Sequence, residues 1–146
     1  YAREYAMMRG GGAALTAADV ESIARGQLDA EEAAIAAAVD CGAPLVVHDT
    51  DLLSTMVYAT EYYGIGAVPA WLPETVVERA PDVYLLCDID VPWHGDPVRD
   101  DTRERHAVQA AFEAALVKMD VPVVRVRGNR AARRGIVRSA VPPFPP

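Results

Sequence analysis

Three short apolar runs, separated by longer stretches of helical periodicity, constrain the fold of this 146-residue chain more than any other feature. The runs cover residues 44–48, 83–87 and 122–127. Short, continuously apolar runs of this kind are typical of strands buried on both faces of a sheet. Strands that alternate with helices predict an α/β fold with a parallel sheet.

Helical patterns fill the segments between the runs. The first begins at Thr16, where Thr16 and Asp19 form a variant of the capping box, and it continues to about residue 39 as one helix or as two broken near Gly26. Its apolar stripe is expected to face the core: Val20, Ile23, Ala24, Leu28, Ala33, Ile35, Ala36 and Val39. Further helices are predicted at residues 52–63, 73–79, 102–119 and 130–140. The helix at 102–119 is amphipathic, with one apolar face: Val108, Phe112, Ala115, Leu116 and Met119.

Composition fits one globular domain over residues 1–141, followed by a proline-rich tail at 142–146. No apolar run approaches the ~20 residues of a membrane-spanning helix, so we expect no membrane partner. The two cysteines, Cys41 and Cys87, give neither a disulfide framework nor zinc-ligand spacing. A reducing, cytoplasmic location is therefore predicted.

Charge is unevenly distributed along the chain, whose net charge is -7. Residues 1–90 hold 4 arginines against 15 acidic residues, whereas residues 91–146 hold 10 basic residues against 6 acidic ones. The overall acidity argues against a nucleic-acid-binding protein. The basic end could meet a small anion such as a nucleotide phosphate, or it could simply be a solvated surface.

Polar residues follow each predicted strand, where ligands of open parallel sheets bind. Acid pairs follow two strands (Asp49 with Asp51, and Asp88 with Asp90), and Gly128-Asn129 follows the third. Carboxylates spaced in this way can hold magnesium together with substrate phosphates. The alternative is that each aspartate caps the next turn or helix.

The loop at residues 90–105 contains Trp93 and three arginines, Arg99, Arg103 and Arg105. Arginine binds phosphate through paired, charged hydrogen bonds, and such a loop could close over a nucleotide. The alternative is a set of surface ion pairs with the neighbouring acids, each worth ~0–1 kcal/mol.

Taken together, four segments resemble the ribosylnicotinamide kinase domain of bacterial bifunctional NAD-biosynthesis regulators, a P-loop AAA-like ATPase family. They are Tyr-Ala-Arg-Glu-Tyr at residues 1–5, Asp-Thr-Asp-Leu-Leu-Ser-Thr at 49–55, Asp-Val-Pro-Trp at 90–93 with Arg99-Asp100, and Gly-Asn at 128–129. The resemblance covers nearly the whole chain. It departs from the family at Gly95-Asp96-Pro97, where the family has an acid-acid-glycine string.

The resemblance implies an ATP-dependent kinase that transfers the γ-phosphate to the 5′-hydroxyl of nicotinamide riboside with Mg²⁺. In this reading Asp49 holds Mg²⁺ through water and Asp51 faces the acceptor ribose, as a possible base. Arg99 and Arg103 are lid residues that steady the phosphoryl group.

The same resemblance implies further binding residues: Gly128 and Asn129 at the adenine, and Arg3 and Glu4 near the acceptor. Tyr58, whose ring could stack on a pyridine or a purine, and Trp93 are further candidate substrate-binding residues. An adenylyltransferase or DNA-binding domain could be fused upstream. Two other functions stay open: a degenerate module that senses nucleotides without catalysis, and an ATPase acting on a different nucleoside or nucleotide.

The phosphate-binding sequence G-x-x-x-x-G-K-[ST] does not occur in these residues, and the one lysine is Lys118. The family's sheet order is 2-3-1-4-5 in a three-layer fold, and strand 1 leads into that loop. We therefore expect a fragment that lacks strand 1 and the P-loop, about 30–40 residues. Residues 45–49 and 83–87 would then have no strand between them.

A gap in the sheet leaves backbone groups unpaired, at ~1–3 kcal/mol for each buried one. We therefore expect the isolated 146 residues to be poorly stable and unable to hydrolyse ATP. Differential scanning calorimetry checks the first expectation, and a cooperative transition above ~50 °C would contradict it.

Overall fold

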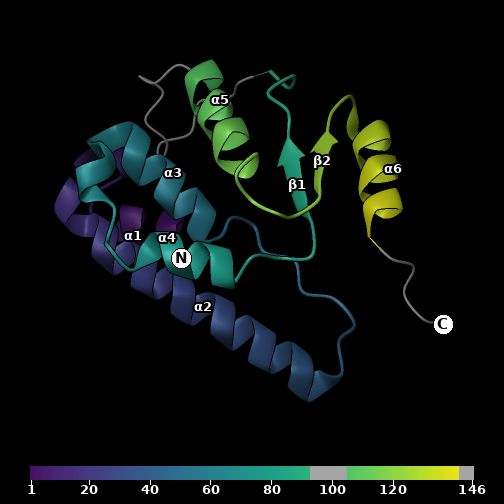
Figure 1. Ribbon diagram of the computed structural model, residues 1–146, viewed down its shortest axis with the longest axis horizontal. Coiled ribbons are helices and arrows are strands. Elements are labelled where there is room, and N and C mark those ends of the chain that lie inside the picture. The colour runs from purple at the N-terminus through teal and green to yellow at the C-terminus, as the bar shows by residue number, and fades with distance from the viewer. Residues whose placement is uncertain (93–104, 142–146) are drawn as a thin grey trace.

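The computed structural model describes residues 1–92 and 105–141, and it shows a mixed α/β fold in which helices predominate (Figure 1). The elements are α1 (Ala2–Met8), α2 (Val20–Cys41), α3 (Leu52–Tyr63), α4 (Leu72–Glu78), β1 (Tyr84–Cys87), α5 (Arg105–Leu116), β2 (Val123–Val126) and α6 (Arg130–Ala140). Short 3₁₀ turns lie at Gly12–Ala14, Ala17–Asp19 and Ile65–Ala67. None of the helices in the described ranges is long and apolar enough to span a membrane.

The sheet consists of β1 and β2, which run parallel with Tyr84 opposite Val123 and Cys87 opposite Val126. Helix α5 connects the two strands, and the pair stands between α5 and α6 (Figure 1). The strand predictions at residues 83–87 and 122–127 are thus confirmed. Burial is only partial, because Cys87 and Val123 remain exposed where no helix covers the sheet.

The strand predicted at residues 44–48 does not form. This segment has no ladder partner among the described residues, and Val47 is 72 % exposed. A run of apolar residues becomes a buried strand only where a neighbouring strand accepts its backbone hydrogen bonds. No described segment provides such a neighbour here.

The amino-terminal part is tied together through Asp19. The predicted capping box is present, with the Thr16 amide donating to Asp19 Oδ2 at 2.9 Å. The Tyr5 hydroxyl donates to the other oxygen at 2.9 Å and so joins α1 to the start of α2. These hydrogen bonds hold the pKa of Asp19 below its usual range, and the bond from the Thr16 amide has the largest effect.

Helix α2 continues through Gly26 without a break. Gly26 allows close approach of α1, because a Cβ built there would lie 2.0 Å from the Tyr1 ring. The sequence analysis placed the first clear element near residue 16, so it missed α1 and the turn at Gly12–Ala14.

The core lies among α2, α3, α4 and α5. Its buried members are Ala24, Leu52, Leu53, Val57, Leu72, Val76 and Leu116. The predicted inner face of α5 is confirmed, since Phe112, Ala115 and Met119 pack against this cluster. The second half of the α2 stripe was predicted wrongly: Ile35 and Val39 are exposed because α2 extends beyond the helices that cover its first half (Figure 1).

Leu72→Ala tests this account of the core. Leu72 is fully buried, so truncation should leave a cavity and lower the free energy of unfolding by about 2–5 kcal/mol. Urea denaturation followed by circular dichroism measures the change. Val117→Ala is the control, because Val117 is 85 % exposed and its truncation should cost less than about 0.5 kcal/mol. Equal losses for the two variants would contradict the assignment.

Candidate functional site

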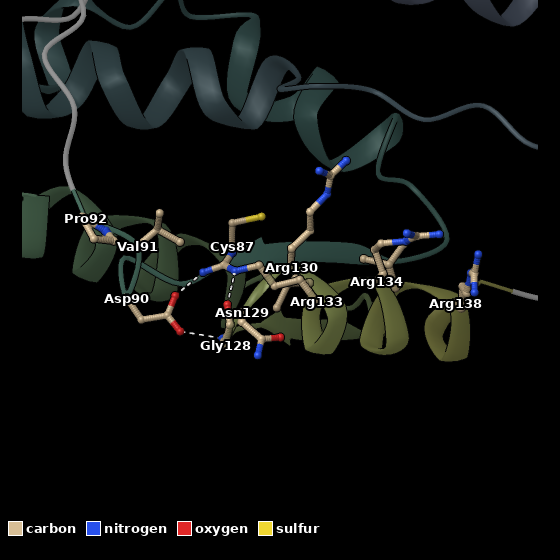
Figure 2. A pocket seen from close by; sticks show the side chains of 12 residues that line it. Cys87, Asp90, Val91, Pro92, Gly128, Asn129, Arg130, Arg133, Arg134 and Arg138 are labelled. Carbon is tan, nitrogen blue, oxygen red and sulfur yellow. Dashed lines mark hydrogen bonds and ion pairs between the residues drawn. The ribbon is translucent and has the colours of Figure 1, made fainter.

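An open cavity of about 980 Å³ lies beyond the carboxyl ends of β1 and β2, beside α6 (Figure 2). Gly128 and Asn129, both predicted to contact adenine, line it. The strands and the turn after β1 contribute the lining residues Cys87, Asp90, Val91, Pro92 and Val126, and α6 contributes Arg130, Arg133, Arg134, Val137 and Arg138.

The turn between β2 and α6 shapes one side of this cavity. Gly128 has a φ of 88°, a conformation that favours glycine, and a Cβ there would meet the Ala132 Cβ at 3.1 Å. The next residue, Asn129, caps α6 by accepting the Ala132 amide at 3.0 Å. A rigid, side-chain-free peptide therefore borders the cavity.

Asp90 and Arg133 hold this turn against the end of β1. The Asp90 carboxylate accepts a hydrogen bond from the Gly128 amide at 2.6 Å and forms an ion pair with the Arg133 guanidinium. Arg133 also donates to the Gly128 carbonyl at 2.8 Å and to the Asp88 carbonyl at 3.1 Å. The pKa of Asp90 is lowered, mainly by the hydrogen bond from the Gly128 amide and secondly by the positive charge of Arg133.

A second group of polar residues surrounds the turn before α3, where the sequence placed two catalytic residues. Asp51 caps α3 by accepting the Ser54 amide at 3.0 Å. Thr50 has a φ of 68°, which is unusual for a β-branched residue and costs of order 1–3 kcal/mol. The buried Gln27 side chain supports it, because its amide donates to the Thr50 carbonyl at 3.3 Å.

Glu31 belongs to this second group and was not predicted. Its side chain is buried and accepts from Gln27 at 3.0 Å. The pKa of Glu31 is raised, mainly because the side chain is buried and secondly because the Asp51 carboxylate is negative. The hydrogen bond from Gln27 and the charges of His48 and Arg79 act in the opposite direction. Gln27 and Glu31 stand four residues apart on the buried side of α2, and that spacing was the available sequence signal.

The described structure does not bring the predicted strand-end residues to one edge of the sheet. Asp51 lies near Tyr84, the first residue of β1, and burial followed by the Asp51 carboxylate raises the pKa of Tyr84. Gly128 instead follows the far end of β2. Asp49 and Asp51 would reach the carboxyl edge of the sheet only if residues 44–48 formed a strand of that sheet. Because that strand does not form, the packing of α3 sets the position of Asp51, near Tyr84.

Asp49 is exposed, and the described residues contain no group of three or more His, Cys, Asp or Glu side chains that could hold a metal. A lone carboxylate still fits Mg²⁺, which commonly takes one protein carboxylate together with water and substrate phosphates. The metal role of Asp49 stays a prediction.

The other predicted residues are dispersed. Arg3 and Glu4 are exposed on α1, away from the cavity. Tyr58 lies on α3 with its ring centroid 5.5 Å from that of Phe112 on α5. Trp93, Arg99 and Arg103 lie outside the described residues.

Comparison with known proteins identifies the family. A family model described as an AAA domain matches residues 1–133. The chain belongs to the AAA domain family. Searches of curated proteins and of solved structures each found no match. Membership supports a P-loop-type nucleotide-binding domain and is compatible with a kinase or an ATPase.

Glu31→Gln tests the buried acid through pH. A raised native pKa means that the native state binds the proton more tightly than the unfolded state, whose pKa is near 4.5. Wild-type stability should therefore fall, relative to Glu31→Gln, as the pH rises from about 4 to 7. Chemical denaturation at several pH values measures this difference. The exposed control Glu78→Gln should show no such trend, and parallel stability curves for the wild type and Glu31→Gln would disprove the shift.

Proposed function

We propose that this AAA domain is an ATP-dependent small-molecule kinase, with nicotinamide riboside as the acceptor. The observation that carries the proposal is the cavity at the carboxyl ends of two parallel strands in a chain of this family. Ligands of open parallel sheets bind at that end.

The cavity suits the adenosine part of ATP. Its apolar wall can cover a purine, and the Gly128 backbone allows close approach because it carries no side chain. The anchored turn is pre-organised, so little conformational entropy is lost on binding. The resemblance noted in the sequence places adenine at the same two residues, Gly128 and Asn129.

The acceptor side is proposed at the turn of residues 49–51. Asp51 is oriented by the Ser54 amide and faces the interior near Tyr84, whereas Asp49 is exposed. Asp49 would hold Mg²⁺ through water, and the ion would neutralise charge on the transferring phosphate. Phosphoryl transfer depends mainly on such positioning and charge neutralisation.

The proposal includes the three-layer sheet order 2-3-1-4-5. In that order residues 45–48 join the sheet, with one further strand between them and β1. Exposed Leu45 and Val47 support this proposal, because apolar side chains gain from burial in a completed sheet. Completion would also bring residues 49–51 to the carboxyl edge that Gly128 occupies.

Asp49→Asn tests the function in the full-length protein. Transfer of radiolabelled γ-phosphate from ATP to nicotinamide riboside, with other nucleosides in parallel, gives the rate. The substitution should lower the rate by orders of magnitude while leaving the melting temperature unchanged, because Asp49 is exposed.

Asp40→Asn is the matched control, since Asp40 is also exposed and lies on α2. Its rate should equal that of the wild type. Near-normal transfer by Asp49→Asn would exclude the metal role. ATP binding without transfer to any acceptor would favour a nucleotide-sensing module over a kinase.

A further inference from the structure

The buried face of α2 changes from apolar to polar part-way along the helix. Its buried residues are Val20, Ile23 and Ala24, followed by Gln27 and Glu31. Gln27 is 6 % exposed and Glu31 is 7 % exposed. Polar side chains are costly to bury unless hydrogen bonds replace those that they make to water. The hydrogen-bond partners of this pair therefore indicate why the face becomes polar here.

The Gln27 side chain joins two segments that are far apart in the chain. Its Nε2 donates to Glu31 Oε1 at 3.0 Å and to the Thr50 carbonyl oxygen at 3.3 Å. A primary amide nitrogen carries two N–H groups, so it can donate to both acceptors at once. The bond to Glu31, about one helical turn away, orients the Gln27 side chain. The other bond reaches across to the turn before α3.

The turn that Gln27 reaches has a strained backbone. Thr50 has a φ of 68°, in the left-handed region that a β-branched residue adopts only at a cost. Such a conformation persists only where the surroundings hold it. The Thr50 side chain is exposed, so its packing does not account for the conformation. The hydrogen bond from Gln27 to the Thr50 carbonyl acts on the strained residue itself.

We propose that Gln27 is a positioning residue, which holds Thr50 in the left-handed conformation and thereby sets the directions of Asp49 and Asp51. Glu31 acts through Gln27, as the acceptor that orients the side-chain amide. Because Thr50 lies between the two aspartates, a change in its φ would turn one carboxylate relative to the other. The inference rests on the proposed function, in which these two aspartates serve the acceptor side.

Substitutions of similar size can separate this role from simple packing. Methionine is about as long as glutamine but has no N–H donor, so Gln27→Met removes both hydrogen bonds and keeps the side-chain volume. Gln109→Met on α5 is the matched control. The Gln109 Nε2 is also buried, but it has no hydrogen-bond partner among the described residues.

The first test measures the backbone of residue 50 in the full-length protein. The three-bond coupling between its amide and α protons, measured by NMR, depends on φ. Gln27→Met should change this coupling, and Gln109→Met should leave it at the wild-type value. Combining Gln27→Met with Thr50→Asn should reduce the change, because asparagine adopts the left-handed region more readily than threonine does. An unchanged coupling in Gln27→Met would overturn the proposal.

The second test measures γ-phosphate transfer at a temperature where circular dichroism shows every variant to be folded. Gln27→Met should lower kcat about 10- to 100-fold because it displaces the aspartates, and Gln109→Met should keep the wild-type rate. In the Thr50→Asn background, the same Gln27→Met change should lower kcat less than about threefold, because the two residues are coupled. A purely structural role of Gln27 would give equal losses in the two backgrounds.

The outcomes separate this inference from the proposed function. A changed coupling at residue 50 with an unchanged kcat would overturn the positioning role and leave the kinase proposal standing. Equal losses of kcat in the two backgrounds would do the same. Failure of the wild type to transfer phosphate to any acceptor would overturn the proposed function and, with it, the positioning role.

Discussion

The packing of α3 determines where the other elements of the helical body lie. Its buried side chains Leu52, Leu53 and Val57 belong to the central cluster, and α2, α4 and α5 all pack around it. Because α3 is enclosed on these sides, its first turn cannot shift without disturbing the core. The strained backbone at Thr50 is therefore tolerated, and Asp51 is held at the amino end of α3.

A second constraint acts at the carboxyl ends of β1 and β2, where polar contacts fix the turn beside the cavity. A two-stranded sheet buries little apolar surface, and an isolated pair of strands is at best marginally stable in water. Polar contacts add to the strand pairing here: Arg125 joins β2 to Asp88, and Arg133 joins α6 to Asp90. The turn beside the cavity is thus fixed mainly by hydrogen bonds and ion pairs, whereas the turn before α3 is fixed by apolar packing.

Sequence patterns predicted the elements whose formation depends on local periodicity. The helices at residues 52–63 and 130–140, and the inner face of α5, match the structure because spacing and capping residues specify them directly. The segment at 44–48 has equally strong apolar character, yet it forms no strand. A strand depends on a partner elsewhere in the chain, which a local pattern does not report.

The candidate site shows the same division. Gly128 and Asn129 lie where a strand end predicts a cavity, because β1 and β2 form a parallel pair and β2 ends just before them. Asp51 lies away from the carboxyl edge of the sheet because residues 44–48, which precede it, do not form a strand. Glu31 was missed because a glutamate within an alanine-rich helix resembles a solvated residue. Its burial in the folded chain, and then the charge of Asp51, make it unusual, and a local sequence pattern shows neither.

Helix α6 also shows how one element can give arginines two different environments. Successive helical residues are rotated by about 100°, so Arg133 and Arg134 point in different directions although they are neighbours in sequence. Arg133 reaches the acid that follows β1, and its charge is used to hold the turn. Arg134 extends to the same side of α6 as Arg130 and Arg138, and these three arginines form no ion pair with a described residue. The acidic residues of the chain are concentrated before residue 91, and Asp88 and Asp90, which follow β1, are paired with Arg125 and Arg133. The position of an arginine around the axis of α6 therefore decides whether its charge holds the fold, as at Arg133, or faces solvent, as at Arg134.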